Sequence, residues 1–337
     1  MKVIKTGSVR VDLLGGTLDI YPINLVLNNV VTLNMATNLM ATVEIEPSNN
    51  GQIIFHSYDY ELTKSFSFHQ LQNINNNLKD FGPFEFIGRI LHFFSPVEGV
   101  KISLSSGAPT GSGLGGSSAM GAVLFSACSE YFNQNYHREK IIEIVQNIES
   151  KILNAGPAGY QDYYPSLFGG ILALVSDFSG VKVNQVYSKG LEEFLQKNIR
   201  LIYSGESRQS GINNWEVYKG FFDKNISMRQ GLEKIAEYSY EAFKSIKDEN
   251  YPKLLKLISM EGNIRESLFP SILTTNMKNF KNDFLKLDPN IGMKICGAGG
   301  GGCFILTGAA EVNLSPLLDK YGMRELPFSV HPPKVEG

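Results

Sequence analysis

The feature that most constrains the fold of this chain is a glycine-rich stretch between a predicted strand and a predicted helix. Residues 107–132 read GAPTGSGLGGSSAMGAVLFSACSEYF. Before the glycines, Val100–Ser105 alternates apolar and polar residues, which is typical of a half-buried strand. After them, Ala119–Phe132 is rich in helix formers, with Ser117 or Gly116 placed to cap the helix. This order predicts an anion site, because loop amides can turn toward one point and the helix dipole adds about half a positive charge there. We expect the anion to be a nucleotide phosphate.

Four interpretations of this loop compete. Gly111-x-Gly113-x-x-Gly116 fits the dinucleotide fingerprint, but that motif needs a second strand after the helix, and a second helix at 138–153 is predicted instead. Gly111 and Gly116 also have Walker spacing, yet two serines follow where Lys-Ser/Thr is required. A tight turn without a ligand is the third alternative. The fourth is a phosphate loop whose charge is neutralised by the helix, by Ser118 and by a metal, and it best explains so many glycine and polar residues before an apolar helix.

The whole chain has the size and composition of a globular protein with two domains. It has 337 residues and a net charge of −2, with no long basic run, which argues against nucleic-acid or membrane-surface binding. The start of the chain does not resemble a signal peptide, and no apolar stretch approaches about 18 residues, so we expect a cytoplasmic protein. The three cysteines lack metal-site spacing and the five histidines are scattered, which disfavours a zinc site or a serine–histidine triad.

Two domains are expected, with a boundary near residues 189–198, so that the first covers 1–193 and the second 194–337. In the first, a strand at Val9–Leu14 runs into the turn 15–19. A second strand at Val30–Ile45 is expected to break near Asn38, with Ile53–Ser57 returning as a hairpin. The second domain is predicted to alternate strands and helices in the order β-α-α-β-β-α-β, which suggests a ferredoxin-like half. Its expected elements are strands at 199–203, 293–296, 303–306 and 325–330, and helices between 213 and 287 and at 314–321.

The helix predicted at 138–153 carries an acid on its apolar face. Its apolar stripe is formed by Ile142, Val145, Ile148 and Ile152. At 100° per residue Glu149 falls inside this stripe, and a buried carboxylate needs a partner. The partner is either a buried Arg or Lys, or a metal ion at the phosphate site.

A second acid follows this helix. Residues 154–165 read NAGPAGYQDYYP, so glycines and prolines forbid regular structure while tyrosines crowd around Asp162. A carboxylate held in this way is a candidate base for a hydroxyl proton. The alternative is that Asp162 caps a short helix that runs through Phe168.

Together these stretches resemble the GHMP kinases. Residues 109–119 are similar to the family's phosphate loop, 294–304 to its C-terminal glycine motif, and 10–19 to the N-terminal motif of its sugar-1-kinase branch. Residues 159–170 resemble the catalytic-aspartate segment of heptose 7-phosphate kinases, and 203–210 a segment shared by heptose and fucose kinases. The N-terminal turn reads Gly-Gly-Thr-Leu-Asp instead of Gly-Gly-Gly-Thr-Asp, and it lacks the Glu-His pair of galactokinases. The resemblance implies an α+β fold of two domains, with a ribosomal protein S5 domain 2-like N-terminal half and a ferredoxin-like C-terminal half.

The resemblance also implies roles for individual residues. Asp162 would be the base toward the acceptor hydroxyl, and Arg10 would lie near Asp162 or the transferring phosphoryl group. Ser118 and Glu149 would hold Mg²⁺ between the β- and γ-phosphates of ATP. The phosphates themselves would be bound by Pro109, Gly111, Ser112, Gly113, Leu114, Gly115, Gly116, Ser117 and Ser118.

Three residues are expected at the acceptor. Asp19 would accept hydrogen bonds from sugar hydroxyls, and Gly159 would lie beside the sugar. Arg208 would either contact a substrate phosphate or pair with Glu206.

The expected activity is therefore ATP-dependent phosphorylation of a sugar or sugar phosphate, at the anomeric hydroxyl, by a monomer or homodimer. Two alternatives remain. The sugar-type segments 10–19 and 203–210 disfavour a mevalonate-pathway kinase. The presence of Asp162, Ser118 and Glu149 disfavours a sensor that binds nucleotide or sugar without catalysis.

Overall fold

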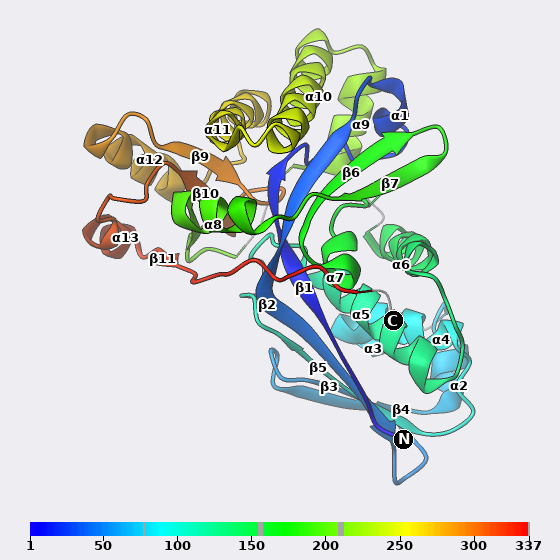
Figure 1. Ribbon diagram of the computed structural model, residues 1–337. Helices are drawn as coiled ribbons and strands as arrows, with labels where there is room; N and C mark the ends of the chain where they lie inside the picture. Colours follow the sequence, from blue (N-terminus) through cyan, green and yellow to red (C-terminus); the bar gives the residue numbers. More distant parts are fainter. Residues whose placement is uncertain (77, 154–157, 208–211, 336–337) are drawn as a thin grey trace.

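The computed structural model describes residues 1–337 except 77, 154–157, 208–211 and 336–337. Figure 1 shows two halves, each with its own sheet. The strands are β1 Val3–Leu14, β2 Val31–Pro47, β3 Ile53–Ser57, β4 Leu62–Phe66, β5 Val100–Ser106, β6 Ile171–Asp177, β7 Gly180–Gln185, β8 Ile199–Tyr203, β9 Gly292–Ile295, β10 Cys303–Thr307 and β11 Arg324–Glu325. The helices are α1 Ile23–Val26, α2 Phe68–Gln72, α3 Leu78–Phe81, α4 Glu85–Phe93, α5 Gly116–Tyr131, α6 Arg138–Leu153, α7 Tyr164–Phe168, α8 Lys189–Asn198, α9 Asn214–Phe222, α10 Ile226–Lys247, α11 Tyr251–Leu268, α12 Thr275–Leu287 and α13 Ser315–Tyr321.

The long strand β2 is the axis of the N-terminal sheet. β1 pairs with it along one edge, and the other edge is shared by β5, at residues 41–47, and β6, at residues 31–35. The break expected near Asn38 is absent, because β2 continues through this residue. Instead, the register with β1 shifts between Ser8 and Arg10. Such a bulge re-aims side chains without ending the strand.

The expected hairpin return of β3 is wrong. β3 pairs antiparallel with β4 and parallel with β5, and it does not pair with β2. The reason is that α2 to α4 form a crossover from β4 to β5, and this crossover lets β5 enter the sheet between β2 and β3.

The C-terminal half has a ferredoxin-like sheet, as expected. Its four antiparallel strands lie in the order β11-β8-β10-β9. The strand predicted at 325–330 is shorter than expected, since β11 has only two residues. The α+β fold of two sheets is confirmed.

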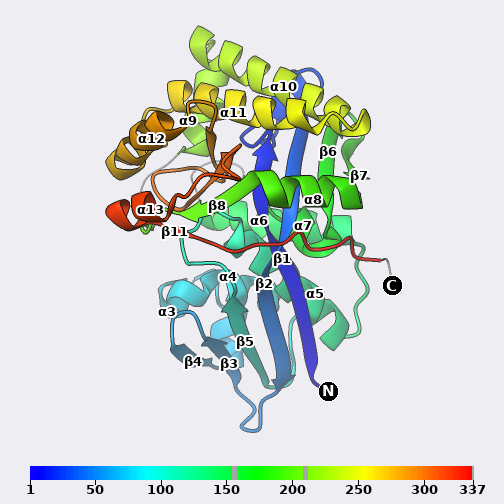
Figure 2. The same cartoon turned by 60° about the vertical axis from the view of Figure 1, so that its left-hand side comes forward.

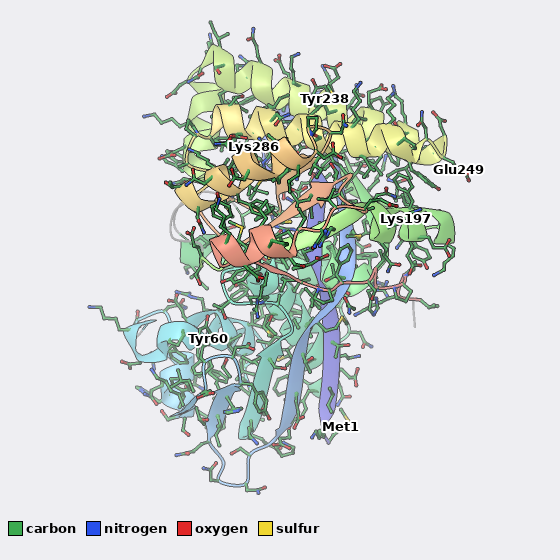
Figure 3. All side chains as sticks on the ribbon, turned by 90° about the vertical axis from the view of Figure 1, so that its left-hand side faces the viewer. Met1, Tyr60, Lys197, Tyr238, Glu249 and Lys286 are labelled. Atoms are coloured by element: carbon green, nitrogen blue, oxygen red, sulfur yellow. The ribbon has the colours of Figure 1, made fainter. Side chains whose placement is uncertain are left out.

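Helices join the two halves. α5 and α7 pack on β1 and β2, while α10 and α11 pack on each other and reach β1 from the other half. Figure 2 shows α10 and α11 crossing above the sheets, and Figure 3 places Glu249, just after α10, and Met1 at opposite ends of the molecule. One apolar cluster includes both Val9 of β1 and Ile305 of β10, so the core is continuous between the halves. No helix in the described part of the chain is long and apolar enough to cross a membrane.

After β11 the chain returns to the N-terminal half. The segment 329–335 crosses β1 and β2 toward α7 (Figure 2). His331 N–H donates to the carbonyl of Ala36, and Gly170 N–H donates to the carbonyl of His331. The Lys334 Nζ donates to the carbonyls of Thr6 at 2.6 Å and Ser166 at 2.9 Å. This segment, the C-terminal strap, therefore ties α7 to the N-terminal sheet.

Candidate active site

The predicted phosphate loop lies at the N-terminus of α5. The helix begins at Gly116 and its N-cap is Gly115, with φ of +71° and no side-chain cap bond, so the expected cap by Ser117 or Gly116 is wrong. Ser117 and Ser118 stand in the first turn, where amides have no acceptor within the helix. These amides and the positive end of α5 face the same cavity as the loop, which is the arrangement of an anion site.

Gly115 also makes room for Asp162. A Cβ built on Gly115 would lie 3.1 Å from the Asp162 carboxyl carbon, and its positive φ is strained for any other residue. The carboxylate therefore stands against the phosphate loop because this position is a glycine.

The C-terminal glycine motif supports the phosphate loop from the other half. The Cys303 N–H donates to the carbonyl of Ser112 at 2.6 Å. Cβ atoms built on Gly302 and Gly297 would lie 2.6 Å from the carbonyl oxygens of Ser112 and Gly113, respectively. The absence of side chains at these glycines thus lets the C-terminal motif lie directly against the phosphate loop.

Arg10 links Asp162 to both glycine motifs. Its Nε and Nη2 contact Asp162 Oδ1 at 2.8 and 2.6 Å. Its Nη1 donates to the carbonyls of Gly113 and Cys296, both at 2.7 Å. α7 has Tyr163 as N-cap and no side-chain cap bond, so Asp162 does not cap this helix. The sequence left two roles open for Asp162, the cap of this helix or a base. Its carboxylate is turned toward Arg10 and the cavity, away from the role of a cap.

Asp19 is a buried acid beside Asp162. Its Oδ1 accepts from the Thr17 N–H at 3.1 Å and its Oδ2 from the Gln161 N–H at 3.0 Å. Burial, and then the nearby Asp162 carboxylate, raise the pKa of Asp19 to about 6. A Cβ on Gly159 would lie 2.3 Å from Asp19 Oδ2, so this glycine lets the chain close over the acid.

Glu149 is buried, as its place in the apolar stripe predicts. Its Oε2 accepts from Ser118 Oγ at 2.8 Å and from Tyr163 Oη at 2.6 Å. Burial raises the pKa of Glu149, and the hydrogen bonds from the Tyr163 and Ser118 side chains oppose that increase. In the described part of the chain its hydrogen-bond partners are hydroxyls, so a buried Arg or Lys as direct partner is not found.

The oxygens of Ser118 and Glu149 fit a magnesium ion. Both residues line the cavity, and hydroxyl and carboxylate oxygens are the hard ligands that Mg²⁺ prefers. No cluster of three or more His, Cys, Asp or Glu in the described residues could hold a metal by itself. Substrate phosphates commonly complete the coordination of Mg²⁺ in such sites.

These groups face one cavity of about 930 Å³. One part is apolar and comes from the N-terminal half, near the turn between β3 and β4 that carries Tyr60 (Figure 3). The other part is charged and lies between the halves. The apolar part is lined by Tyr60, Pro83, Phe84, Phe86, Ile87, Leu104 and Met120; the charged part is lined by Arg10, Asp12, Asp19, Asp162 and Arg265.

The structure brings nearly all predicted site residues to this cavity. Gly159 and every phosphate-loop residue named above line it except Leu114, which is fully buried and whose carbonyl accepts the Arg10 N–H at 3.0 Å. Arg208 lies outside the described residues. Two residues of the site were not predicted from the sequence: Tyr163, the partner of Glu149, and Arg265, which contacts Asp12 at 3.0 Å. Arg265 did give a signal, because it lies at helical spacing from Leu254 and Ile258 on the buried face of α11, but this signal was overlooked.

Comparisons with known proteins agree with this fold. The family model "GHMP kinases N terminal domain" matches residues 84–170. Mevalonate kinase of Methanocaldococcus jannaschii is 27% identical over 292 residues, which cover 81% of this chain and 84% of that protein. The crystal structure of the M. jannaschii (Methanococcus jannaschii) enzyme matches with a TM-score of 0.75 at 23% identity, over 98% of each chain. A D-glycero-D-manno-heptose 1-phosphate kinase from Bacteroides thetaiotaomicron matches with a TM-score of 0.70 at 18% identity, over 100% of each chain.

Proposed function

We propose that this chain, which belongs to the GHMP kinase superfamily, transfers the γ-phosphoryl group of ATP to the anomeric hydroxyl of a sugar or sugar phosphate. Membership of this superfamily supports a small-molecule phosphotransferase, and the identity of the acceptor as a sugar is what we propose. One observation carries the proposal: Asp162 stands against the phosphate loop while Arg10 binds both of them.

The phosphate loop would hold the triphosphate. Loop amides and the N-terminus of α5 would bind the phosphate oxygens, and the apolar part of the cavity around Tyr60 and Phe86 would receive the base of the nucleotide. Ser118 and Glu149 would hold Mg²⁺, which when bound neutralises charge on the phosphates. Phosphoryl transfer leaves the protein mainly positioning and charge stabilisation to supply.

Asp162 would accept the proton of the acceptor hydroxyl. Both contacts from the Arg10 side chain use Oδ1, which leaves Oδ2 for the hydroxyl. Arg10 holds the carboxylate in one orientation, and its charge lies beside the path of the phosphoryl group. A positioned base contributes typically about 10²–10⁴-fold to the rate.

The charged part of the cavity favours an acceptor that presents hydroxyl groups, and no carboxylate, to Asp19 and Asp162. Asp19 and Asp162 both offer carboxylate oxygens to hydroxyl donors. Among the described lining residues the only cations are Arg10 and Arg265, and each already contacts a carboxylate and a backbone carbonyl. A carboxylate-bearing acceptor such as mevalonate would meet two acids there. The similarity to a mevalonate kinase nevertheless makes mevalonate the alternative to test.

An acceptor panel tests this proposal. ATP-dependent release of ADP would be measured with heptose 7-phosphate, galactose, fucose and mevalonate, and ³¹P NMR of the product would identify the phosphorylated hydroxyl. We expect turnover with a sugar or sugar phosphate. In Asp162→Asn, kcat should fall at least about 100-fold while affinity for ATP is nearly kept. Preference for mevalonate would refute the sugar acceptor, and full turnover by Asp162→Asn would remove Asp162 from its role.

A further inference from the structure

A cluster of four buried charges lies beside the candidate active site, and two of its members, Asp12 and Arg265, also line the cavity. Asp12 comes from β1, Glu261 and Arg265 from α11, and Lys294 from β9, and each residue is at most 3% exposed. Asp12 Oδ2 contacts Lys294 Nζ at 2.8 Å and Arg265 Nη1 at 3.0 Å. Glu261 Oε1 lies 3.5 Å from Lys294 Nζ and 3.8 Å from Arg265 Nη1. The cluster therefore joins the two halves of the molecule.

The cluster also binds the backbone of the segment that carries Arg10 and Asp19. Lys294 Nζ donates to the carbonyl of Asp12 at 3.0 Å, and Glu261 Oε2 accepts from the Gly15 N–H at 2.7 Å. The turn packs directly on the charges, since a Cβ on Gly16 would lie 2.1 Å from Asp12 Oδ2 and 3.0 Å from Arg265 Nη1.

Two contacts of the same kind join β1 to β9 and to the residue that follows β9. Arg10 and Asp12 lie two positions apart on β1, so their side chains share a face. Lys294 on β9 binds Asp12, and Cys296, two positions later, accepts from Arg10 Nη1. Arg265 Nη2 donates to the next carbonyl, that of Gly297, at 2.8 Å. The contacts of Arg10 are thus continuous with those of the four-charge cluster.

Stability alone is a poor reason for such a cluster. Moving ions out of water is energetically costly, and apolar side chains of similar volume often replace a buried ion pair without loss of stability. Within the described part of the chain, Asp12 Oδ1, Glu261 Oε1 and Arg265 Nε also have no hydrogen-bond partner. The four charged side chains do, however, fix the backbone between Arg10 and Asp19 through their contacts with Asp12 and Gly15.

We propose that Lys294 and Arg265 are positioning residues for phosphoryl transfer, because they fix Asp12 and the Gly15–Gly16 turn and thereby place Arg10 and Asp19 at the acceptor. This inference rests on the proposed function of the same site. Apart from its contacts with Arg10, the phosphate loop is held by residues outside the cluster, including Cys303 and Gly302, so nucleotide binding should depend little on the cluster.

Lys294→Met is the primary test, because methionine keeps much of the side-chain length and removes the ammonium group. We expect kcat to fall at least about tenfold and the acceptor KM to rise, since a misplacement of about 1 Å can cost about 100-fold in rate. Equilibrium affinity for a non-hydrolysable ATP analogue should stay within about twofold. The matched control is Lys281→Met, which removes another ammonium group paired with α11, through Glu266 at the position next to Arg265. Its kinetic constants should stay unchanged.

A double variant separates positioning from simple stability. In Glu261→Gln/Lys294→Met one charge of each sign is removed, so the remaining pair of Asp12 and Arg265 is balanced. We expect the Tm to recover relative to Lys294→Met while kcat stays low. Recovery of kcat together with Tm, or a parallel loss of nucleotide affinity, would overturn the inference. If Lys294→Met does not fold, Arg265→Lys replaces it, because lysine keeps the charge but cannot bind Asp12 and Gly297 together; unchanged kcat and acceptor KM would then refute the inference.

Failure of this inference can be told apart from failure of the proposed function. Wild-type protein that phosphorylates no sugar refutes the acceptor assignment, whichever variants fold. The crystal structure of Lys294→Met gives a readout without substrate: we expect Arg10 Nη1 to lose the Cys296 carbonyl. If wild type is active and the contacts of Arg10 are unchanged in the variant, the positioning role is refuted and the proposed function stands.

Discussion

Asp19 is a buried carboxylate with few groups to offset its charge. Its pKa of about 6 means that the folded protein keeps a proton on Asp19 under conditions where the unfolded chain, with an ordinary pKa of 3.8, has released it. Ionisation of Asp19 therefore destabilises the fold as pH rises from about 4 to 6, and the full cost of about 3 kcal/mol applies above that window. The carboxylate is retained at a position where it weakens the fold, which fits a role in binding.

Asp19→Asn should consequently stabilise the protein at neutral pH. Asparagine keeps one oxygen for the backbone N–H groups of Thr17 and Gln161, so we expect a gain of about 1–2 kcal/mol at pH 7.5 and a smaller one at pH 5. The acceptor KM should rise at least about tenfold, because a charged acceptor of hydroxyl hydrogen bonds is lost. Urea unfolding at the two pH values measures the first effect and steady-state kinetics the second. A gain that does not depend on pH would contradict the raised pKa.

Glu149 and Tyr163 should affect the use of magnesium. Glu149→Gln removes the charge of the carboxylate, and Tyr163→Phe removes the hydroxyl that donates to Oε2 at 2.6 Å. We expect the Mg²⁺ concentration for half-maximal activity to rise about 10–100-fold in the first variant and less in the second. Binding of Mn²⁺ with an ATP analogue, followed by paramagnetic relaxation of water, gives a readout without turnover. An unchanged metal dependence in Glu149→Gln would count against its role.

Some of these residues could be found in the sequence and others could not. Glu149 was identifiable because a single acid interrupts an apolar stripe at helical spacing. Lys294 gives a similar signal, as the one charge in the buried strand β9, and it was overlooked. The hydroxyl of Tyr163 gave no signal, because its contact with Glu149 depends on how the segment after α6 folds back, and periodicity does not report this.

At the scale of elements, helices and strands with a clear period were predicted well, and their pairing was not. α6 and the strand β5 lie within a residue of their expected bounds. β3 was assigned to the wrong partner because strand pairing depends on the crossover through α2 to α4, which local patterns do not encode. The last strand was overestimated because residues 329–335 are extended but pair with the other half.

The glycine motif between β9 and β10 acts through its shape. Gly302→Ala would place a Cβ 2.6 Å from the Ser112 carbonyl, at a residue with φ of +78°. We expect the KM for ATP to rise at least about tenfold, because the phosphate loop must shift. Gly322→Ala is the matched control: its φ is +63°, and its Cβ would meet nothing within 4 Å. Both variants should lose about 1–2 kcal/mol from the left-handed backbone, and only Gly302→Ala should lose nucleotide affinity. Equal ATP kinetics in the two variants would show that the contact with Ser112 is unimportant.

At the scale of the whole molecule, the C-terminal strap fastens the far end of the chain to the N-terminal sheet. Lys334→Met removes the hydrogen bonds to Thr6 and Ser166. Because burial lowers the pKa of Lys334 to about 8, the cost of burying the ammonium group offsets part of their value. The free energy of unfolding should therefore fall by only about 0.5–1.5 kcal/mol. Lys320→Met is the control, since Lys320 is exposed and pairs with Asp283 within the C-terminal half, so its effect on stability should be much smaller. Urea unfolding of both variants, followed by circular dichroism, checks the difference. Equal midpoints would mean that the strap is held by its backbone bonds alone.

The support given by Cys303 to Ser112 has a consequence for how nucleotide binding arises. A fragment that ended before β8 would contain the whole phosphate loop, yet it would lack the Cys303 amide and the glycine motif against which that loop packs. Affinity for ATP would then belong to neither sheet alone. The protein would bind ATP only after both sheets had folded and packed together. Binding of a fluorescent ATP analogue during refolding would therefore report when the two halves have docked.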